Sequence, residues 1–574
     1  MAIRTFGWVQ DPGKIENLRK TVEVFYHESP TYKELIETQI PTLVEEQDGR
    51  DRFLLELSRT PVKLKYKDLV GTAFKPRSQS RCNGILQAAI RGQKRPFIVD
   101  WPADNFLRWA HALGFIQYDV NADCFSITEF GLKYTKTQPE TPSETEILSQ
   151  AFLSYPPVMR VLNLLADGSH LTKFEIGRQL GFVGEDGFTS LPQNILVRSL
   201  AQTEDRKQRN KMLTDWDGTS DKYARMIANW LKHMGWVTQV EKQVLVTFGD
   251  EQCQCFIPQA YLITPKGLQA RRRGLGTNIQ SRISKNVFWE MLATKGKDRK
   301  YIRTRRALIL QGIDKRDLSL QALQQFLADK GFNESETTIA NDLKGLEQIG
   351  LNIQQTQGRY FLQDTIQNLV IPNFITEETV KSDIQELVDR CRELLKHVPH
   401  EYLVLIPMSF SSQDSRLFEM KTVELLVDQC GFNGLHLGGA NQPDGLIFTQ
   451  KLAEDYGVII DTKAYKSGFN IPASERDKMT RYVNENLQRN QMHSPKWWGH
   501  FPSKVDLFKF LFVSGRFGGA YESQLTRISS LTQNTLGAAI TSYNLLLMAE
   551  AIVQKKVNLQ NVGEKFSCLS EVVI

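Results

Sequence analysis

The 574-residue chain contains no run of about 18 apolar residues, the length that a membrane-crossing helix needs. Its first residues, MAIRTFGWVQDPGK, lack the apolar core of a secretory signal peptide. The sequence therefore predicts neither a secreted nor a membrane-spanning protein, and we expect a cytoplasmic location.

Cysteine is scarce and irregularly spaced, with seven residues in the whole chain. An odd, irregular set is typical of free thiols in a reducing compartment and excludes a disulfide framework. Cys253 and Cys255 form the one close pair. No second pair and no nearby histidine completes a zinc site, so we do not expect structural zinc.

The composition is that of a globular protein, with 41% hydrophobic and 24% charged residues. The length exceeds what one core supports and predicts about three to five domains. The net charge of +6 does not point to nucleic acid by itself, but basic residues cluster at 271–273 and at 295–306. Such islands suit phosphate backbones, and a solvated basic surface is the alternative interpretation.

One layout occurs three times: a helix ends in an apolar–glycine–apolar step and passes into two alternating strands, at Gly114, Gly235 and Gly350. Glycine fits a helix C-cap because it adopts the left-handed conformation without penalty. Helix, glycine and β-hairpin follow the plan of a winged helix, a helix-turn-helix variant whose last helix can enter the DNA major groove. We therefore predict a multidomain α+β chain with three winged-helix N-terminal subdomains.

The second unit offers the best candidate for a DNA-reading helix. Apolar residues recur there with helical spacing, and Ser220 or Asp221 is expected to cap the helix. Guanine accepts from arginine and lysine, and adenine pairs with asparagine. The opposite face carries side chains of these types: Lys222, Arg225 and Asn229. An ordinary solvent-facing stripe is the alternative, which the flanking hairpin pattern disfavours.

The third unit differs in charge. Ser335 is expected to cap a helix whose outer face carries Glu336, Asp342 and Glu347. Phosphate would be repelled by such a face. We therefore predict that this winged helix contacts protein and holds the C-terminal domain.

The C-terminal segment carries the candidate catalytic centre. Val458–Ile460 is a β-branched run typical of a buried strand, and Asp461 and Lys463 would point to one face of it. Pro443-Asp444 opens the preceding strand of a hairpin. Two carboxylates on adjacent strands can hold Mg²⁺, which would polarise a scissile phosphate and activate a water. Lys463 would then orient that water or stabilise developing negative charge.

Two neighbouring residues have less certain roles. Glu419, on a helix expected over 416–427, is either an accessory metal ligand or a solvent-facing side chain. His436 is better interpreted as a structural or phosphate-contacting residue than as a general base. No nucleophilic triad, phosphate-binding loop or dinucleotide fingerprint occurs, so we expect no nucleotide cofactor.

Several segments together resemble the FokI family of type IIS restriction endonucleases over nearly the whole chain: RTFGWVQDPGK, FLRWAHALGF, HLTKFEIG, SDKYARMI, YGVIIDTKAY and FKFLFVSG. The resemblance implies a bacterial enzyme that binds a short asymmetric site in double-stranded DNA. It would cut both strands a fixed distance away and leave 5′-phosphate ends. The C-terminal domain would be an α/β PD-(D/E)XK nuclease that uses Mg²⁺, with Mn²⁺ as a substitute.

The resemblance also implies transient pairing with a second copy of the chain, which is otherwise a monomer. The family's pairing helix matches 472–490, with Asp477 and Arg481 as interdomain salt-bridge residues. An ion pair within one helix is the alternative for these two residues. The nuclease domain would rest against the recognition domains until the site is bound.

For base reading, the resemblance carries the family's contacts onto Gln10, Arg77, Trp101, Lys222 and Arg225. Trp101 fits a thymine methyl, and the three basic residues fit guanine. GGATG is the first expectation for the site. The chain departs from the family pattern at Asp11 and around Thr214, so which bases these positions select stays open.

We therefore expect recognition subdomains at 1–142 and 143–280, a protein-contacting subdomain at 281–368, a linker at 369–380 and a cleavage domain at 381–574. Two alternatives remain: a nicking enzyme without productive pairing, and a non-catalytic DNA-binding regulator. Intact Asp444, Asp461 and Lys463 disfavour the regulator.

Overall fold

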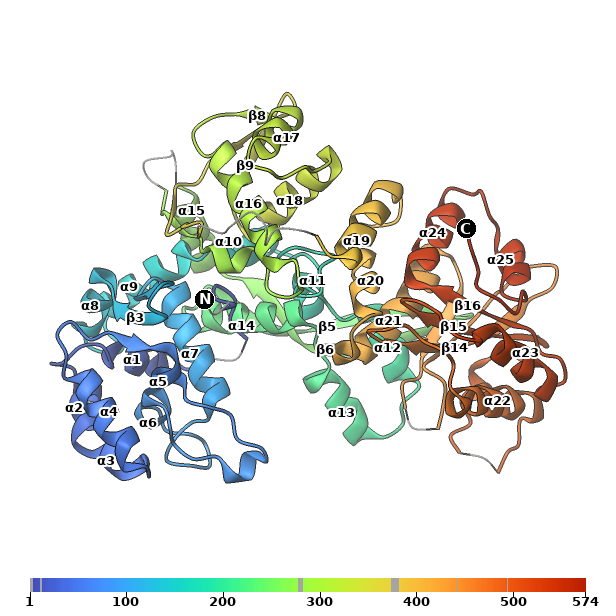
Figure 1. Ribbon diagram of the computed structural model, residues 1–574, viewed down its shortest axis with the longest axis horizontal. Helices are drawn as coiled ribbons and strands as arrows, with labels where there is room; N and C mark the ends of the chain where they lie inside the picture. Colours follow the sequence, from blue (N-terminus) through green and yellow to red (C-terminus); the bar gives the residue numbers. More distant parts are fainter. Residues whose placement is uncertain (1–3, 11–12, 277–281, 373–380, 440, 493) are drawn as a thin grey trace.

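The computed structural model describes residues 4–10, 13–276, 282–372, 381–439, 441–492 and 494–574 (Figure 1). The predicted base contact at Asp11 and residues 373–380 of the predicted linker lie outside these ranges. The chain combines helices with several small sheets and one larger, C-terminal sheet. Over the described ranges, no helix is both long and apolar enough to cross a membrane.

The threefold layout of helix, glycine and hairpin is confirmed. The glycines Gly114, Gly235 and Gly350 have φ values of 77°, 69° and 109°, which favour glycine. In each unit a short upstream strand pairs with the second hairpin strand and completes a three-stranded sheet. The units are α7 (Asp100–Ala112) with β2 (Ile116–Asp119), β3 (Cys124–Ile127) and β1 (Leu64–Lys65); α14 (Thr219–His233) with β5 (Val237–Phe248), β6 (Glu251–Ile263) and β4 (Leu171–Thr172); and α18 (Glu336–Gln348) with β9 (Ile353–Thr356), β10 (Arg359–Leu362) and β8 (Leu318–Ser319).

Helix α14 buries the predicted apolar stripe, and Asp221 caps its start through a capping-box contact, although neither Ser220 nor Asp221 is the N-cap residue. The N-cap is Gly218, and Asp221 lies one turn further in, fully buried. Its carboxylate accepts hydrogen bonds from the Gly218 amide at 2.8 Å and the Ser190 hydroxyl at 2.6 Å. The sequence does not show that the loop containing Ser190 folds over the helix start, so Asp221 looks like a surface residue.

In α18, Ser335 caps the helix as predicted, and its hydroxyl accepts from the Thr338 amide. The prediction for Asp342 was wrong, because this residue is fully buried instead of lying on an acidic outer face. Its carboxylate accepts hydrogen bonds from Nε of Arg305 at 2.6 Å and from Nε of Arg306 at 2.7 Å. Glu336 and Glu347 are exposed, as expected.

Three arginines of the basic island at 295–306 are therefore not available to a phosphate backbone. Arg303, Arg305 and Arg306 lie on α16 (Arg299–Ile313) and are at most 2% exposed. Burial of a charge is costly unless it is paired, and the sequence alone does not reveal the carboxylates that pair with these arginines. The second island, 271–273, lies at the surface, where Arg273 pairs with Glu146.

The C-terminal lobe contains a five-stranded mixed sheet in the order β12-β13-β14-β15-β16. The first three strands are antiparallel neighbours, and β14, β15 and β16 run parallel. Helices α21 and α24 pack on the sheet, and α22 contacts β14 and α23. These elements span β12 (Asn433–His436), β13 (Gly445–Phe448), β14 (Tyr456–Lys463), β15 (Leu507–Ser514), β16 (Gly537–Thr541), α21 (Ser415–Glu424), α22 (Ala473–Gln488), α23 (Tyr521–Leu531) and α24 (Ser542–Val553).

The second unit packs directly against the edge of this sheet. Helix α12 (Gln193–Ala201) lies along β12, where the Ser199 hydroxyl donates to the His436 carbonyl at 3.0 Å. The hairpin β5–β6 adds an edge-to-face contact between Phe248 and Phe448, with ring centroids 5.8 Å apart. Helix α12 and the distal part of the β5–β6 hairpin thereby share one hydrophobic core with the C-terminal lobe, whereas α14 packs in the core of the N-terminal part of the chain.

The third unit contacts the C-terminal lobe as predicted, through α19 (Asp383–Leu394). The Ser335 hydroxyl donates to Glu393, and Arg392 donates to Thr338 at 3.4 Å. The second unit shares this contact, as the expectation that the nuclease domain rests against the recognition domains implies.

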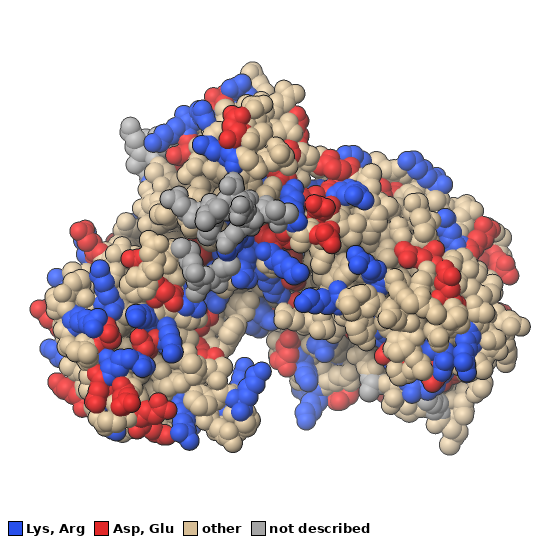
Figure 2. Space-filling view, viewed as in Figure 1, with Lys and Arg blue, Asp and Glu red and all other residues tan. Residues whose placement is uncertain are grey.

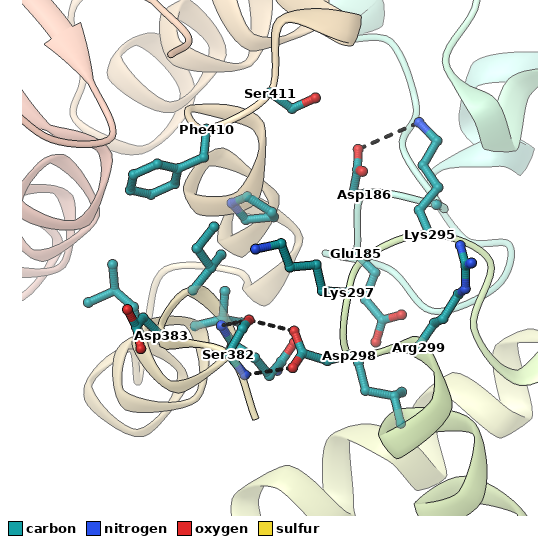
Figure 3. A pocket seen from close by; sticks show the side chains of 18 of the residues that line it. Glu185, Asp186, Lys295, Lys297, Asp298, Arg299, Ser382, Asp383, Phe410 and Ser411 are labelled. Carbon is teal, nitrogen blue, oxygen red and sulfur yellow. Dashed lines mark hydrogen bonds and ion pairs between the residues drawn. The ribbon is translucent and has the colours of Figure 1, made fainter. Parts of the chain in front are cut away.

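A cavity of about 910 Å³ lies where the second unit, the third unit and the C-terminal lobe meet (Figure 3). Lys295 bridges across it, 3.6 Å from Asp186 of the second unit and 2.9 Å from Asp414 of the C-terminal lobe. On the opposite wall the Ser382 hydroxyl donates to Asp298 at 2.6 Å. Charged contacts therefore join all three parts at one junction.

We predict that Asp342→Ala destabilises the chain by about 3–5 kcal/mol, because it leaves Arg305 and Arg306 buried with one carboxylate fewer. Urea denaturation of the full chain measures this change. Glu336→Ala, on an exposed position of the same helix, is the control and should change stability by at most about 1 kcal/mol. Equal effects of the two substitutions would contradict the buried network.

Candidate active site and DNA-reading surface

The sheet register brings the two predicted carboxylates together. Strands β13 and β14 are antiparallel with Gly445 opposite Ile460. Asp444 and Asp461 are the next residues on the two strands, both beyond the same end of this pair. The run Val458–Ile460 is fully buried, as its β-branched side chains predict. Asp444 is anchored on β14, where its Oδ2 accepts from the amide of Thr462 at 2.7 Å and from its hydroxyl at 3.0 Å.

Asp461 and Lys463 point to the same face, as predicted. Nζ of Lys463 lies 2.7 Å from Oδ2 of Asp461 and 2.9 Å from Oε2 of Glu475, a residue of α22. Nζ of Lys478, one turn further along that helix, lies 3.6 Å from Oδ1 of Asp461. Two lysines therefore face the carboxylates from one side.

Burial and like charge act against ionisation of Asp444. Its desolvation, together with the neighbouring Asp461 and Glu419 carboxylates, raises the pKa of Asp444 well above its usual value. Burial alone would lower the pKa of Lys463, but the Asp461 and Asp444 carboxylates outweigh burial and raise it. The site thus concentrates negative charge where a cation would relieve it.

The donor set fits a hard cation that keeps some of its waters. Both oxygens of Asp461 are buried and have the ammonium groups of Lys463 and Lys478 as ion-pair partners, so a cation bound there competes with these lysines. Across the described ranges, no three or more His, Cys, Asp or Glu side chains are grouped to hold a metal. Two carboxylates completed by water and a substrate phosphate match the preference of Mg²⁺ and do not match a zinc site.

Glu419 and His436 form a pair behind the carboxylates. Nε2 of His436 lies 2.9 Å from Oε2 of Glu419, and the imidazole is 2% exposed. The ring also makes an edge contact with Trp216, at 6.1 Å between centroids. His436 is therefore enclosed by protein, which fits the structural role, while the ligand role of Glu419 stays a prediction.

The two predicted reading helices are packed together. Trp109 of α7 stacks on Trp230 of α14, with ring centroids 4.8 Å apart and an angle of 14° between the planes. Trp101, near the start of α7, is 43% exposed. The candidate side chains on α14 are partly exposed, as a reading face requires: Lys222, Arg225 and Asn229.

Of the other candidates, one lies beside α7 and two are exposed. The backbone amide of Gln10 donates to Oδ1 of Asn105 at 3.2 Å, and the Asn105 side-chain amide donates to the Trp101 carbonyl at 2.9 Å. Gln10 therefore lies beside the start of α7. Arg77 and Thr214 are exposed, the latter on α13 (Arg206–Asp215). Figure 2 shows a notch between the N-terminal and C-terminal lobes, with Lys and Arg side chains on both rims.

Asp217 is a residue that the sequence analysis did not single out. Its side chain is 2% exposed and bridges Nζ of Lys173 at 2.5 Å and a guanidinium nitrogen of Arg225 at 2.9 Å. Arg225 is thereby held in a fixed orientation on α14. Asp217 lies in the loop before α14 and Arg225 lies within the helix, eight residues later. The sequence spacing alone therefore does not predict that their side chains form an ion pair.

Comparison with known proteins identifies each part of the chain. Models of the FokI recognition subdomains 1 and 2 match residues 4–137 and 144–278, the FokI D3 domain matches 292–358, and the FokI cleavage domain matches 381–573. The type II restriction enzyme FokI of Planomicrobium okeanokoites is 45% identical over 98% of both chains. This chain belongs to the FokI family.

Further FokI-family relatives agree with this assignment. The type II restriction enzyme StsI of Streptococcus sanguinis is 31% identical, covering 97% of this chain and 94% of its own. Structures of FokI bound to DNA and of FokI superpose with TM-scores of 0.94 and 0.92, at 44% identity over the full length of both chains. The chain is therefore a type II restriction endonuclease that acts on DNA in a sequence-specific way, and the resemblance noted in its sequence is confirmed.

The segment 472–490, expected from the sequence to mediate pairing, contains α22, whose N-cap is Pro472. The side chains of Asp477 and Arg481 are 63% and 47% exposed. Asp477 pairs with the adjacent Arg476, and Arg481 pairs with Glu485. The alternative pair between Asp477 and Arg481 is therefore not the arrangement seen, and both side chains reach the surface.

We predict that Asp444→Asn stabilises the metal-free FokI-family enzyme and removes its response to Mg²⁺. Because the folded-state pKa of Asp444 lies above its unfolded value, ionising it costs stability at neutral pH, and an amide avoids this cost. Melting temperature should rise by about 2–4 °C. Mg²⁺ should then stabilise the parent but not the variant.

The control is Asp506→Asn, at an exposed position outside the site. It should leave both the melting temperature and the Mg²⁺ response unchanged. A lower melting temperature for Asp444→Asn, or a retained Mg²⁺ response, contradicts the assigned site.

Proposed function

We propose that this chain is a type IIS restriction endonuclease. It binds a short asymmetric site in double-stranded DNA and hydrolyses both strands at a fixed distance from it, leaving 5′-phosphate ends. The observation that carries the proposal is the separation of two machineries in one chain. The reading helices lie in the first two units, and the acidic centre at Asp444, Asp461 and Lys463 lies in a different lobe.

For base reading we propose that the units of helix, glycine and hairpin are winged helices, with α7 and α14 in the major groove. Arg77, Lys222 and Arg225 offer donors suited to guanine, and Trp101 offers an apolar face for a thymine methyl. Gln10, Asp11, Thr214 and Asn229 complete the set, with GGATG as the starting expectation for the site. Subdomains at 1–142, 143–280 and 281–368, a linker at 369–380 and a nuclease domain at 381–574 describe this division.

For cleavage we propose a PD-(D/E)XK centre in which Asp444 and Asp461 hold Mg²⁺, or Mn²⁺ in its place, with Glu419 as an accessory ligand. The bound ion supplies a Lewis acid for the scissile phosphate and lowers the pKa of the attacking water. Thr462 orients Asp444 through its amide and hydroxyl. Lys463, kept protonated by its carboxylate neighbours, stabilises the negative charge that develops on the phosphate.

One centre does not readily cut two antiparallel strands, so we propose that two nuclease domains pair transiently through α22. Exposed Asp477 and Arg481 would form salt bridges between copies, and the chain is otherwise a monomer. Before site binding, the second and third units restrain the nuclease domain. Arg178 of the second unit supports this restraint, because it lies 2.6 Å from Glu401 and 3.4 Å from Glu424 of the nuclease domain.

The decisive experiment is Asp461→Ala. Cleavage of a plasmid with Mg²⁺ should fall below detection, while binding to the site, measured by gel shift, should be retained. Sequencing the ends left by the parent enzyme gives the recognised site and the cut offsets together. Undiminished cutting by the variant excludes the proposed centre, and an inactive parent favours the alternative of a DNA-binding regulator.

Pairing is tested by Asp477→Ala combined with Arg481→Ala. We expect double-strand cleavage to fall at least about tenfold while nicked plasmid accumulates. The reason is that a weakened pair of nuclease domains dissociates after the first strand is cut and before the second is cut. Raising the enzyme concentration should partly restore double-strand cutting. An unchanged ratio of linear to nicked product excludes this surface. The nicking-enzyme alternative is tested separately, because it predicts that the parent enzyme itself yields nicked plasmid and no linear plasmid.

A further inference from the structure

Lys463 is held by two carboxylates that come from different elements. Asp461 lies on the same strand, and Glu475 lies in the first turn of α22, twelve residues further along the chain. The Lys463 side chain is 10% exposed and that of Glu475 is 22% exposed, so water screens neither contact fully.

The middle of α22 is packed into the core of the C-terminal lobe. Met479 and Val483 are fully buried, and Tyr482 is 1% exposed with its ring edge against Trp497. A helix fixed in this way presents Glu475 to the catalytic centre at a defined place. Its carboxylate can then restrain a long, flexible lysine side chain.

The same helix carries the exposed Asp477 and Arg481. Glu475 and Lys478 face the catalytic centre, whereas these two residues face solvent. One helix therefore has one side in the catalytic centre and another side available to a second copy of the chain.

We propose that Glu475 is a positioning residue that holds the Lys463 ammonium in place for cleavage. The inference rests on the proposed function, in which Asp461 binds the metal. Once a cation draws on the Asp461 carboxylate, the hold of Asp461 on Lys463 weakens, and Glu475 is the partner that remains within 2.9 Å. Lys463 then stays beside the scissile phosphate instead of adopting other rotamers.

The test is Glu475→Gln in the full chain, which keeps the side-chain shape and removes the charge. Its matched control is Glu522→Gln, since Glu522 also lies in the first turn of a helix, α23, but is exposed. Single-turnover cleavage of a one-site DNA is measured at saturating Mg²⁺ over a series of enzyme concentrations. Gel shift gives the affinity for the site.

We expect Glu475→Gln to lower the saturating rate constant by about 10- to 100-fold, the usual effect of losing a partner that orients a catalytic group. The enzyme concentration at half-maximal rate, the site affinity and the melting temperature should stay at the parent values. Glu522→Gln should match the parent in every measurement.

Two results would overturn the inference. One is a parent-like saturating rate for Glu475→Gln. The other is a deficit that disappears at high enzyme concentration, which would place the defect in pairing. Asp461→Ala, assayed in parallel, separates this failure from failure of the proposed function. An inactive Asp461→Ala beside an active Glu475→Gln rejects Glu475 alone, whereas an active Asp461→Ala rejects the centre itself.

Discussion

A continuous network of buried and half-buried ion pairs joins the parts of this chain. It runs from Glu185 of the second unit through Arg306, Asp342 and Arg305 of the third unit to Glu334, and from there through Lys381 to Asp389 and Arg392 of α19. Buried charges are tolerated only when they are paired, so each part requires the next to complete its pairing. The position of the nuclease lobe against the recognition units depends on this constraint.

The nuclease centre places opposite demands on stability and chemistry. Asp444 is half-buried beside two other carboxylates, and its desolvation together with their charge raises its pKa, so the fold works against its ionisation. A core that served stability alone would replace this group with an apolar side chain. These acids, together with a lysine shared between two carboxylates, are the arrangement that we propose carries out DNA cleavage.

Local patterns predicted the elements, and contacts between distant segments explain what they missed. Strand alternation and β-branching placed Asp444, Asp461 and Lys463 correctly, because those residues lie on one hairpin. Helical periodicity correctly predicted which apolar residues of α14 and α18 face the core. It misplaced Asp342 on the surface, since burial of a carboxylate depends on arginines about 36 positions away. The roles of Asp217 and Glu475 could not be predicted for the same reason, because their ion-pair partners lie on other elements of the fold.

The stack of Trp109 on Trp230 has a consequence for how new specificities can arise. Helices α7 and α14 are joined through fully buried rings and cannot slide or swing apart, so in the proposed function the base pairs that they contact lie at a fixed separation along the duplex. A site with a spacer of variable length is incompatible with such a joint. Relatives with different target sequences would therefore diverge in the side chains that these helices display, while the number of base pairs between the contacts stays the same.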